Sequence, residues 1–151
     1  NHVDHIGGLK AFRDRGKAPL AVHQADNHKW LPFQPEIFLN DGDVIRVGKV
    51  RIEAIFTPGH TPGSMCFKIG EYLFGGDTLF PGGPGRTISA AAFGQIVKSI
   101  TEKLFVLPDR IRVFPGHGGP TTIKKAKEEF AVFLSHQHDP KLHGDVVWLK
   151  S

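Results

Sequence analysis

NHVDHIGG, residues 1–8, opens the chain and places three side chains that can bind a metal ion, those of His2, Asp4 and His5, within four consecutive positions. Gly7 and Gly8 follow at once, and glycine lets the backbone turn sharply and approach a bound group closely. Imidazole and carboxylate are ligands that zinc, iron and manganese accept. The stretch therefore indicates part of a metal site whose remaining ligands come from elsewhere in the chain.

Three later loops repeat this combination of a predicted strand end, glycine and a ligand. They are TPGHTPGS (57–64), GGDTLF (75–80) and FPGHGGPTT (114–122), which supply His60, Asp77 and His117. A lone histidine in a turn is usually a solvated surface residue, and a lone aspartate before threonine is usually a cap. Loops over a rigid sheet are, however, common positions for binding residues. Because four loops share the pattern, we interpret them together as one metal centre without thiolate ligands.

The spacing of apolar residues predicts a mixed α/β fold that spans residues 1–151 as a single domain. Two hairpins are expected over 43–57 and 64–77, with turns at Gly48-Lys49 and Gly70-Glu71, so at least part of the sheet is antiparallel. Residues 1–8 and 80–87 are predicted as loops. The other predicted elements are helices over 9–16, 24–31, 90–107 and 121–138, the last capped by threonine, and strands over 19–23, from 110 onwards and in the tail after 139.

The charge pattern argues against nucleic-acid binding. The formal net charge is +4, from 19 lysines and arginines against 15 aspartates and glutamates, and the basic residues are scattered. The densest group, Lys124, Lys125 and Lys127, precedes two glutamates and is typical of a solvated helix face. No apolar run approaches the roughly 18 residues that would span a membrane. The single cysteine, Cys66, excludes an internal disulfide, fits a cytoplasmic location, and is expected to serve in packing.

The four motifs together resemble those of the metallo-β-lactamase-fold hydrolases, closest to the glyoxalase II (hydroxyacylglutathione hydrolase)-like branch. That family begins its first motif as H-x-H-x-D-H, and residues 1–5 supply all of it except the first histidine. His60, Asp77 and His117 match the later motifs in order, whereas β-lactamases proper usually carry cysteine at the position of Asp77. The resemblance implies an αββα sandwich whose first strands precede this motif. We therefore expect the chain to begin inside the motif and the fold to be N-terminally incomplete.

The resemblance also implies two divalent metal ions, with zinc as the first choice and iron or manganese as alternatives. His2 and His60 would hold one ion together with the missing histidine, while Asp4, His5 and His117 would hold the second. Asp77 would bridge the two ions. Asp4 would orient a hydroxide shared by the metals and accept a proton, which makes it the expected catalytic residue. The implied reaction is hydrolysis of a thioester or a related ester-like bond in a small molecule.

Arg86 in GGPGRT (82–87) is the candidate substrate-binding residue. An arginine on a glycine-rich loop can hold a carboxylate through two hydrogen bonds, and a basic residue at the matching point of glyoxalase II relatives contacts a substrate carboxylate. An arginine that only ties down its own loop is an equal alternative. The family's extra C-terminal helical region, which supplies other glutathione contacts, is missing from the sequence, so a glutathione thioester is not expected as the specific substrate.

Two other functions remain open. Persulfide dioxygenases of the same superfamily use one iron held by two histidines and an aspartate. They carry a similar G-x-G-R-T loop, but theirs continues with D-F where this chain has Ile88-Ser89. The third interpretation is a metal-binding remnant without turnover. Separately, a sheet left uncovered by the missing N-terminal strands is expected to favour homo-oligomers. The remaining histidines are expected to be structural or solvated; they are His23, His28, His136, His138 and His143.

Overall fold

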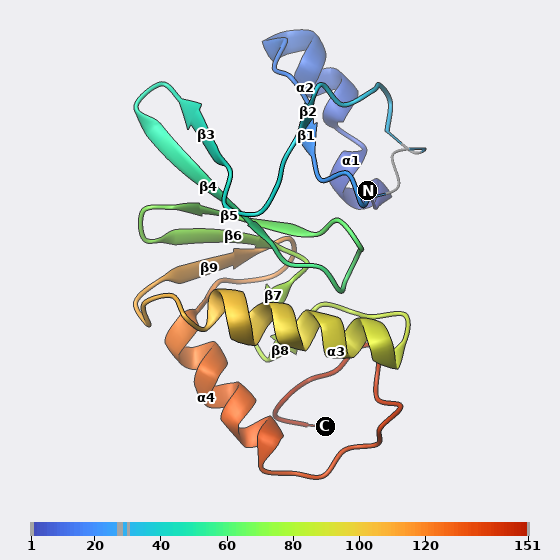
Figure 1. Ribbon diagram of the computed structural model, residues 1–151, viewed down its shortest axis with the longest axis vertical. Coiled ribbons are helices and arrows are strands. Elements are labelled where there is room, and N and C mark those ends of the chain that lie inside the picture. The colour runs from blue at the N-terminus through green and yellow to red at the C-terminus, as the bar shows by residue number, and fades with distance from the viewer. Residues whose placement is uncertain (1, 27–28, 30, 151) are drawn as a thin grey trace.

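The computed structural model describes residues 2–26, 29 and 31–150, and its centre is a six-stranded mixed sheet (Figure 1). The strand order is β10-β9-β6-β5-β4-β3. Only β6 and β9 pair in parallel, and the other neighbours are antiparallel. The strands are β3 (Val44–Val47), β4 (Val50–Phe56), β5 (Met65–Ile69), β6 (Tyr72–Gly76), β9 (Arg112–Pro115) and β10 (Thr121–Thr122).

Both predicted hairpins are confirmed at the predicted turns. Val47 pairs with Val50 across the first turn, and Ile69 pairs with Tyr72 across the second. Gly48 and Gly70 adopt φ angles of 58° and 57°, a left-handed conformation that glycine enters without steric cost. The two hairpins stand side by side in the sheet, because β4 also pairs with β5.

Helix α3 (Ala90–Ser99) continues into one π-helical turn, η2 (Ile100–Leu104), and α4 (Ile123–Leu134) follows β10. Both helices have a hydroxyl residue as N-cap. The hydroxyl of Ser89 accepts a hydrogen bond from the Ala92 N–H, and that of Thr122 accepts one from the Lys125 N–H. The helix predicted over 121–138 is therefore right in its cap but too long at both ends. Thr121–Thr122 is a strand, and the helix stops where the Ser135 hydroxyl donates to the Val132 carbonyl at 2.7 Å.

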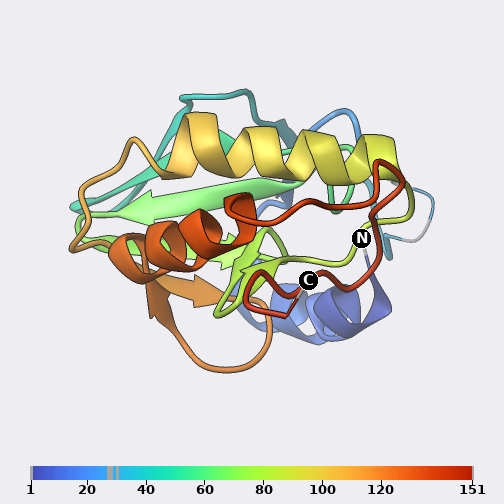
Figure 2. The ribbon, with the colours of Figure 1, turned by 90° about the horizontal axis from the view of Figure 1, so that it is seen from below.

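The hydrophobic core lies between one face of the sheet and the helices α3 and α4 (Figure 2). Leu73 and Val113 point from the sheet into it, and Ile96 and Ile123 meet them from the helices. Cys66 is fully buried in this core, as expected for a packing residue. Burial raises the pKa of its thiol to about 11, so the thiol stays protonated and unreactive at neutral pH.

The N-terminal region differs most from the prediction. The opening residues form one helical turn, α1 (Val3–Ile6), and not a loop, before the expected α2 (Leu9–Gly16). The strand predicted over 19–23 is reduced to β1 (Ala21–Val22), which pairs in parallel with an unpredicted β2 (Ile37–Phe38). Residues 24–26 form a turn and a bend where a helix was predicted, and His28 lies outside the described residues. Two-residue strands are too short for a periodic signal.

Two smaller expectations were also wrong. The glycine-rich loop over 80–87 contains part of a small hairpin, β7 (Leu79–Phe80) and β8 (Gly83–Pro84). The described tail after 139 forms no strand, and its β-type pairing is an isolated bridge between Gly144 and Thr87. No helix in the described part of the chain is long and apolar enough to cross a membrane.

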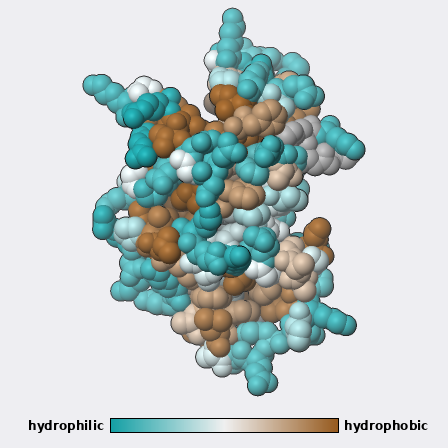
Figure 3. Space-filling model, in the orientation of Figure 1, coloured by the Kyte–Doolittle hydropathy of each residue, from teal (hydrophilic) through white to brown (hydrophobic). Residues whose placement is uncertain are grey.

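The sheet face turned away from α3 and α4 carries aromatic residues. Phe74 stacks on Phe114 with ring centroids 5.7 Å apart, and Tyr72 lies 6.0 Å from the same ring. Phe74 keeps 46% of its surface exposed. Other hydrophobic side chains reach the surface between the β3–β4 hairpin and α2 (Figure 3). The architecture is thus α/β, with one face of the main sheet covered by helices and the other partly open.

Candidate metal centre

Asp77 stands at the centre of the site, immediately after β6 ends at Gly76. Its Oδ2 atom lies 3.2 Å from His5 Nε2, 3.5 Å from His60 Nε2 and 3.8 Å from His117 Nε2. Its side chain is only 12% exposed, whereas the His117 side chain is 52% exposed. A largely buried carboxylate just after the end of β6 is therefore surrounded by imidazole rings from three other segments.

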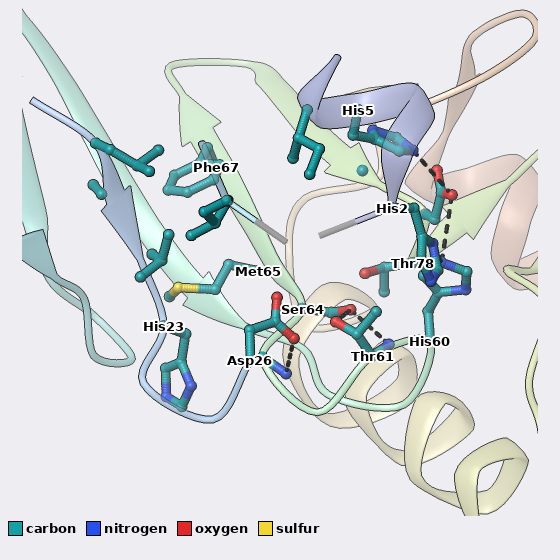
Figure 4. A pocket seen from close by; sticks show the side chains of 18 of the residues that line it. His2, His5, His23, Asp26, His60, Thr61, Ser64, Met65, Phe67 and Thr78 are labelled. Atoms are coloured by element: carbon teal, nitrogen blue, oxygen red, sulfur yellow. Dashed lines mark hydrogen bonds and ion pairs between the residues drawn. The ribbon is translucent and has the colours of Figure 1, made fainter. Parts of the chain in front are cut away.

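The six residues predicted as metal ligands come together in two groups. One contains His2, His60 and Asp77, the other Asp4, His5 and His117, and within each group the ligand atoms lie within 4.8 Å of one another. His2 Nδ1 is 3.1 Å from His60 Nε2, and the two rings meet edge to face, with their planes 89° apart (Figure 4). His117 Nε2 is 3.1 Å from Asp4 Oδ2. The two groups contain the residues of the two predicted ligand sets, with Asp77 Oδ2 near histidines of both, and their role as metal ligands stays a prediction.

The single turn of α1 explains how the opening stretch serves both groups. His2 is its N-cap residue in extended conformation, while Asp4 and His5 lie within the turn. The change from extended to helical backbone after His2 separates it from the other two ligands. The sequence showed the three residues as adjacent but did not predict this turn.

The residues present fit a metal ion. Asp77 Oδ1 is buried and has no hydrogen-bond partner among the described residues, and an orphaned carboxylate oxygen is costly unless a cation or a donor meets it. A Cβ atom at Gly116 would lie 2.3 Å from this oxygen and 2.7 Å from His5 Cε1. Glycine is therefore required there for the carboxylate and the imidazole to stand where they do. Nitrogen and carboxylate donors suit zinc, iron or manganese.

The hydrogen bond of His60 selects its ring tautomer. His60 Nδ1–H donates to the backbone carbonyl oxygen of Arg86 at 2.8 Å. This leaves Nε2, the atom that faces Asp77, with its lone pair free for a cation.

The surroundings of the Asp4 carboxyl favour its ionised form. Desolvation opposes this, but its own backbone N–H and the charges of His5 and His117 keep the pKa of Asp4 below the usual value.

A buried polar chain supports the Asp77 loop and was not predicted. The hydroxyls of Thr57 and Thr78 lie 3.1 Å apart, both fully buried, and Thr57 also contacts Cys66 Sγ at 3.4 Å. Thr57 begins the loop that carries His60, and Thr78 follows Asp77. These side-chain contacts therefore join the loop of His60 to the loop of Asp77, and they become visible only in the tertiary structure.

Two cavities open from the site. One, of about 230 Å³, extends past His2 and His5 to Met65 and Phe67 on the sheet (Figure 4). The other, of about 310 Å³, is lined by the glycine-rich loop, by Arg86 and by tail residues including Asp145, and it reaches His60, Asp77 and His117. The glycine-rich loop is held from below by Glu129, a buried residue of α4 whose Oε2 accepts from the Gly82 N–H at 2.8 Å.

The histidines outside the site behave as structural groups. His23 stacks on Phe56 with ring centroids 4.0 Å apart, and His138 stacks on Phe133 at 3.8 Å. His136 and His143 lie at hydrogen-bond distance from nearby backbone carbonyls at 3.0 and 2.7 Å. In the described part of the chain, none of these residues belongs to a group that could hold a metal ion.

Comparison with known proteins decides the family. The model of the metallo-beta-lactamase superfamily matches residues 1–117. The chain belongs to the metallo-beta-lactamase superfamily. A probable metallo-hydrolase of Bacillus subtilis, YqgX, is 32% identical over 148 residues, which cover 85% of this chain and 70% of that protein.

Two further matches extend the comparison. A hydroxyacylglutathione hydrolase of Maricaulis maris is 29% identical over 150 residues and covers 97% of this chain. The crystal structure of ETHE1 from Myxococcus xanthus matches with a TM-score of 0.72 and 33% identity over 83% of this chain. The chain spans 56% of the length of each of these two proteins. The metallo-beta-lactamase fold expected from the motifs is thus confirmed. Binding of divalent metal ions is a property of this superfamily.

Proposed function

We propose that this chain is a metal-dependent hydrolase of thioesters or related ester-like bonds. The observation that supports this most strongly is the position of the Asp77 carboxylate, whose Oδ2 lies within 3.8 Å of histidines from both ligand groups. Similarity to a probable metallo-hydrolase and to a hydroxyacylglutathione hydrolase favours the same class of reaction. A cytoplasmic location remains part of this proposal.

The two ligand groups would each hold one divalent ion, with Asp77 shared between them. Such a pair of ions, zinc in the first place, would lower the pKa of a water molecule and polarise the carbonyl of an ester. The first group, His2 with His60, offers two imidazoles. The second, Asp4 with His5 and His117, adds a carboxylate of its own. Without cations the two carboxylates would repel each other, so metal binding is expected to stabilise the site.

Asp4 is the proposed catalytic residue of the chain itself. Its carboxylate stands beside His117 at 3.1 Å, and its side chain is 58% exposed on the open side of the site. The lowered pKa keeps it ionised at neutral pH, so it can accept a hydrogen bond from an attacking water and orient it. Its position between solvent and the buried Asp77 suits transfer of the proton outwards.

Arg86 is the proposed substrate-binding residue, for a carboxylate on a small molecule. It lines the 310 Å³ cavity that also reaches Asp77 and His117, and its side chain is 71% exposed. Its backbone carbonyl is fixed by His60, so the guanidinium is carried by a segment already attached to the metal centre. Among the described residues, the ion pair of Arg86 is made with Asp145 of the tail and not with a residue of its own loop.

Thiol release tests the proposal. The chain is stripped of metal, reloaded with zinc, iron(II) or manganese, and mixed with small acyl thioesters while free thiol is measured. Metal-dependent release that chelation abolishes supports the proposal, and its absence with all three metals contradicts it. Inactivity with metal bound would favour the remnant interpretation.

The second candidate function is a mononuclear iron oxygenase. The group Asp4, His5 and His117 contains two histidines and one carboxylate, the ligand set that such enzymes use. Oxygen consumption in the presence of iron(II) and a persulfide, with iron bound at one equivalent per chain, would favour this reaction over hydrolysis.

A further inference from the structure

The tail of the chain forms one wall of the cavity that holds Arg86. Gly144 and Thr87 exchange two backbone hydrogen bonds of 3.0 and 3.1 Å, and the backbone N–H of Trp148 donates to the Gly82 carbonyl at 2.8 Å. The indole of Trp148 is fully buried among Phe105 and Phe130, which anchors the end of the segment in the core. Residues 144–148 are therefore attached on both sides of Asp145.

This attachment places Asp145 beside the substrate-binding candidate. Asp145 Oδ2 lies 3.5 Å from Arg86 Nε, and the two side chains are 81% and 71% exposed. Both residues line the cavity that reaches His60, Asp77 and His117. A pair so exposed is weak, and it therefore leaves the guanidinium available to a ligand.

We propose that Asp145 is a specificity-determining residue that reduces the preference of the pocket for anionic substrates. The inference rests on the proposed function in treating this cavity as the substrate pocket. A substrate carboxylate at Arg86 must displace Asp145 or share the guanidinium with it, and in both cases it stands near a like charge. A neutral substrate meets no such opposition.

The role is one of charge and not of anchoring. The contacts that hold the segment are made by the backbone of Gly144 and Trp148 and by the buried indole, and none involves the Asp145 carboxylate. Asp145→Asn removes the charge, keeps the size of the side chain and leaves those contacts in place. Since the pair is exposed, we expect an effect of about two- to fivefold.

Binding of matched unreactive ligands is the direct test. The probes are 3-(methylthio)propionate and its uncharged amide, titrated into the wild type, Asp145→Asn and the control Glu71→Gln by calorimetry or NMR. Glu71 pairs with the exposed Arg110 at the opposite end of β6 from Asp77, so the control breaks a similar ion pair away from the pocket. The acetyl thioesters of 3-mercaptopropionate and its amide give the matching kinetic comparison.

Asp145→Asn should tighten binding of the carboxylate about two- to fivefold, leave the amide unchanged, and lose this effect as salt is added. For the thioesters, the KM of the acidic substrate should fall while kcat stays constant. The same ratio of anion to amide affinity in Asp145→Asn and the wild type, including no binding of either, overturns the inference. A shifted binding ratio without hydrolysis of any thioester would contradict the proposed function and still support the role of Asp145.

Discussion

His60 Nδ1–H donates to the carbonyl oxygen of Arg86 at 2.8 Å, which connects a candidate metal ligand directly to the candidate substrate-binding residue. The same ring directs Nε2 towards the Asp77 carboxylate, 3.5 Å away. A displacement of the glycine-rich loop would therefore move the His60 ring, because the orientation of this ring depends on its hydrogen bond to the loop. The pairing makes the two halves of the site one structural unit.

Arg86→Ala should raise the KM for acidic thioesters roughly three- to tenfold and spare neutral ones, because the guanidinium is the group expected to meet the substrate carboxylate. Arg110→Ala is the matched control, since Arg110 is an exposed arginine in an ion pair with Glu71. Steady-state kinetics on a charged and an uncharged thioester gives the answer. Equal effects on both substrates would show that Arg86 only holds its loop.

Gly116→Ala should weaken metal binding about 10- to 100-fold, because the new methyl group would stand 2.3 Å from Asp77 Oδ1 and push the carboxylate out of place. Gly119→Ala is the control in the same loop, since a Cβ atom there meets nothing within 4 Å. Competition with a chromophoric chelator measures the affinities. Equal affinity in the two variants would mean that the Asp77 carboxylate does not need this space.

Asp41 should stabilise the fold at neutral pH and cease to do so in acid. Its carboxylate pairs with Lys103 and accepts from the Phe56 N–H at 2.9 Å; although desolvation opposes them, these contacts hold its pKa below the usual 3.8. A depressed folded-state pKa gives stability that is present above 3.8 and lost as pH falls through the folded value.

Asp41→Asn should therefore lower the free energy of unfolding by about 1 kcal/mol at pH 7. This difference from the wild type should approach zero once the pH has fallen below the folded-state pKa of Asp41. Urea unfolding at a series of pH values from neutral to acid measures it. A stability difference that stayed constant with pH would show that the charge of Asp41 is not responsible.

The exposed aromatic face should cause this chain to self-associate. Phe74→Glu places a charge in the stack with Phe114 and is expected to shift the chain towards monomer in sedimentation experiments. Val106→Glu is the control, because Val106 is 72% exposed but follows η2 and does not belong to the sheet. If the wild type is a monomer at all concentrations, or both variants behave alike, the face is not an association surface.

The parts of the fold that were predictable are those with local signals. Gly48 and Gly70 marked both hairpin turns, and the glycines beside His60 and Asp77 marked ligand loops whose order matched a family pattern. The strand β2 was missed because two residues after a proline carry no periodicity. The contacts of Glu129 with Gly82 and of Asp145 with Arg86 were missed for a different reason, since each joins segments that are remote in sequence and meet only through tertiary packing.

Asp77 is placed to serve both ligand groups, and the metal content of Asp77→Ala measures whether it does so. The variant and the wild type are purified alike and loaded with zinc, and bound metal per chain is determined by elemental analysis alongside thioester hydrolysis. Because both groups depend on this carboxylate, Asp77→Ala should lose metal from both of them and lose hydrolysis, while circular dichroism shows that the variant remains folded. Near wild-type metal content and turnover in Asp77→Ala would contradict it.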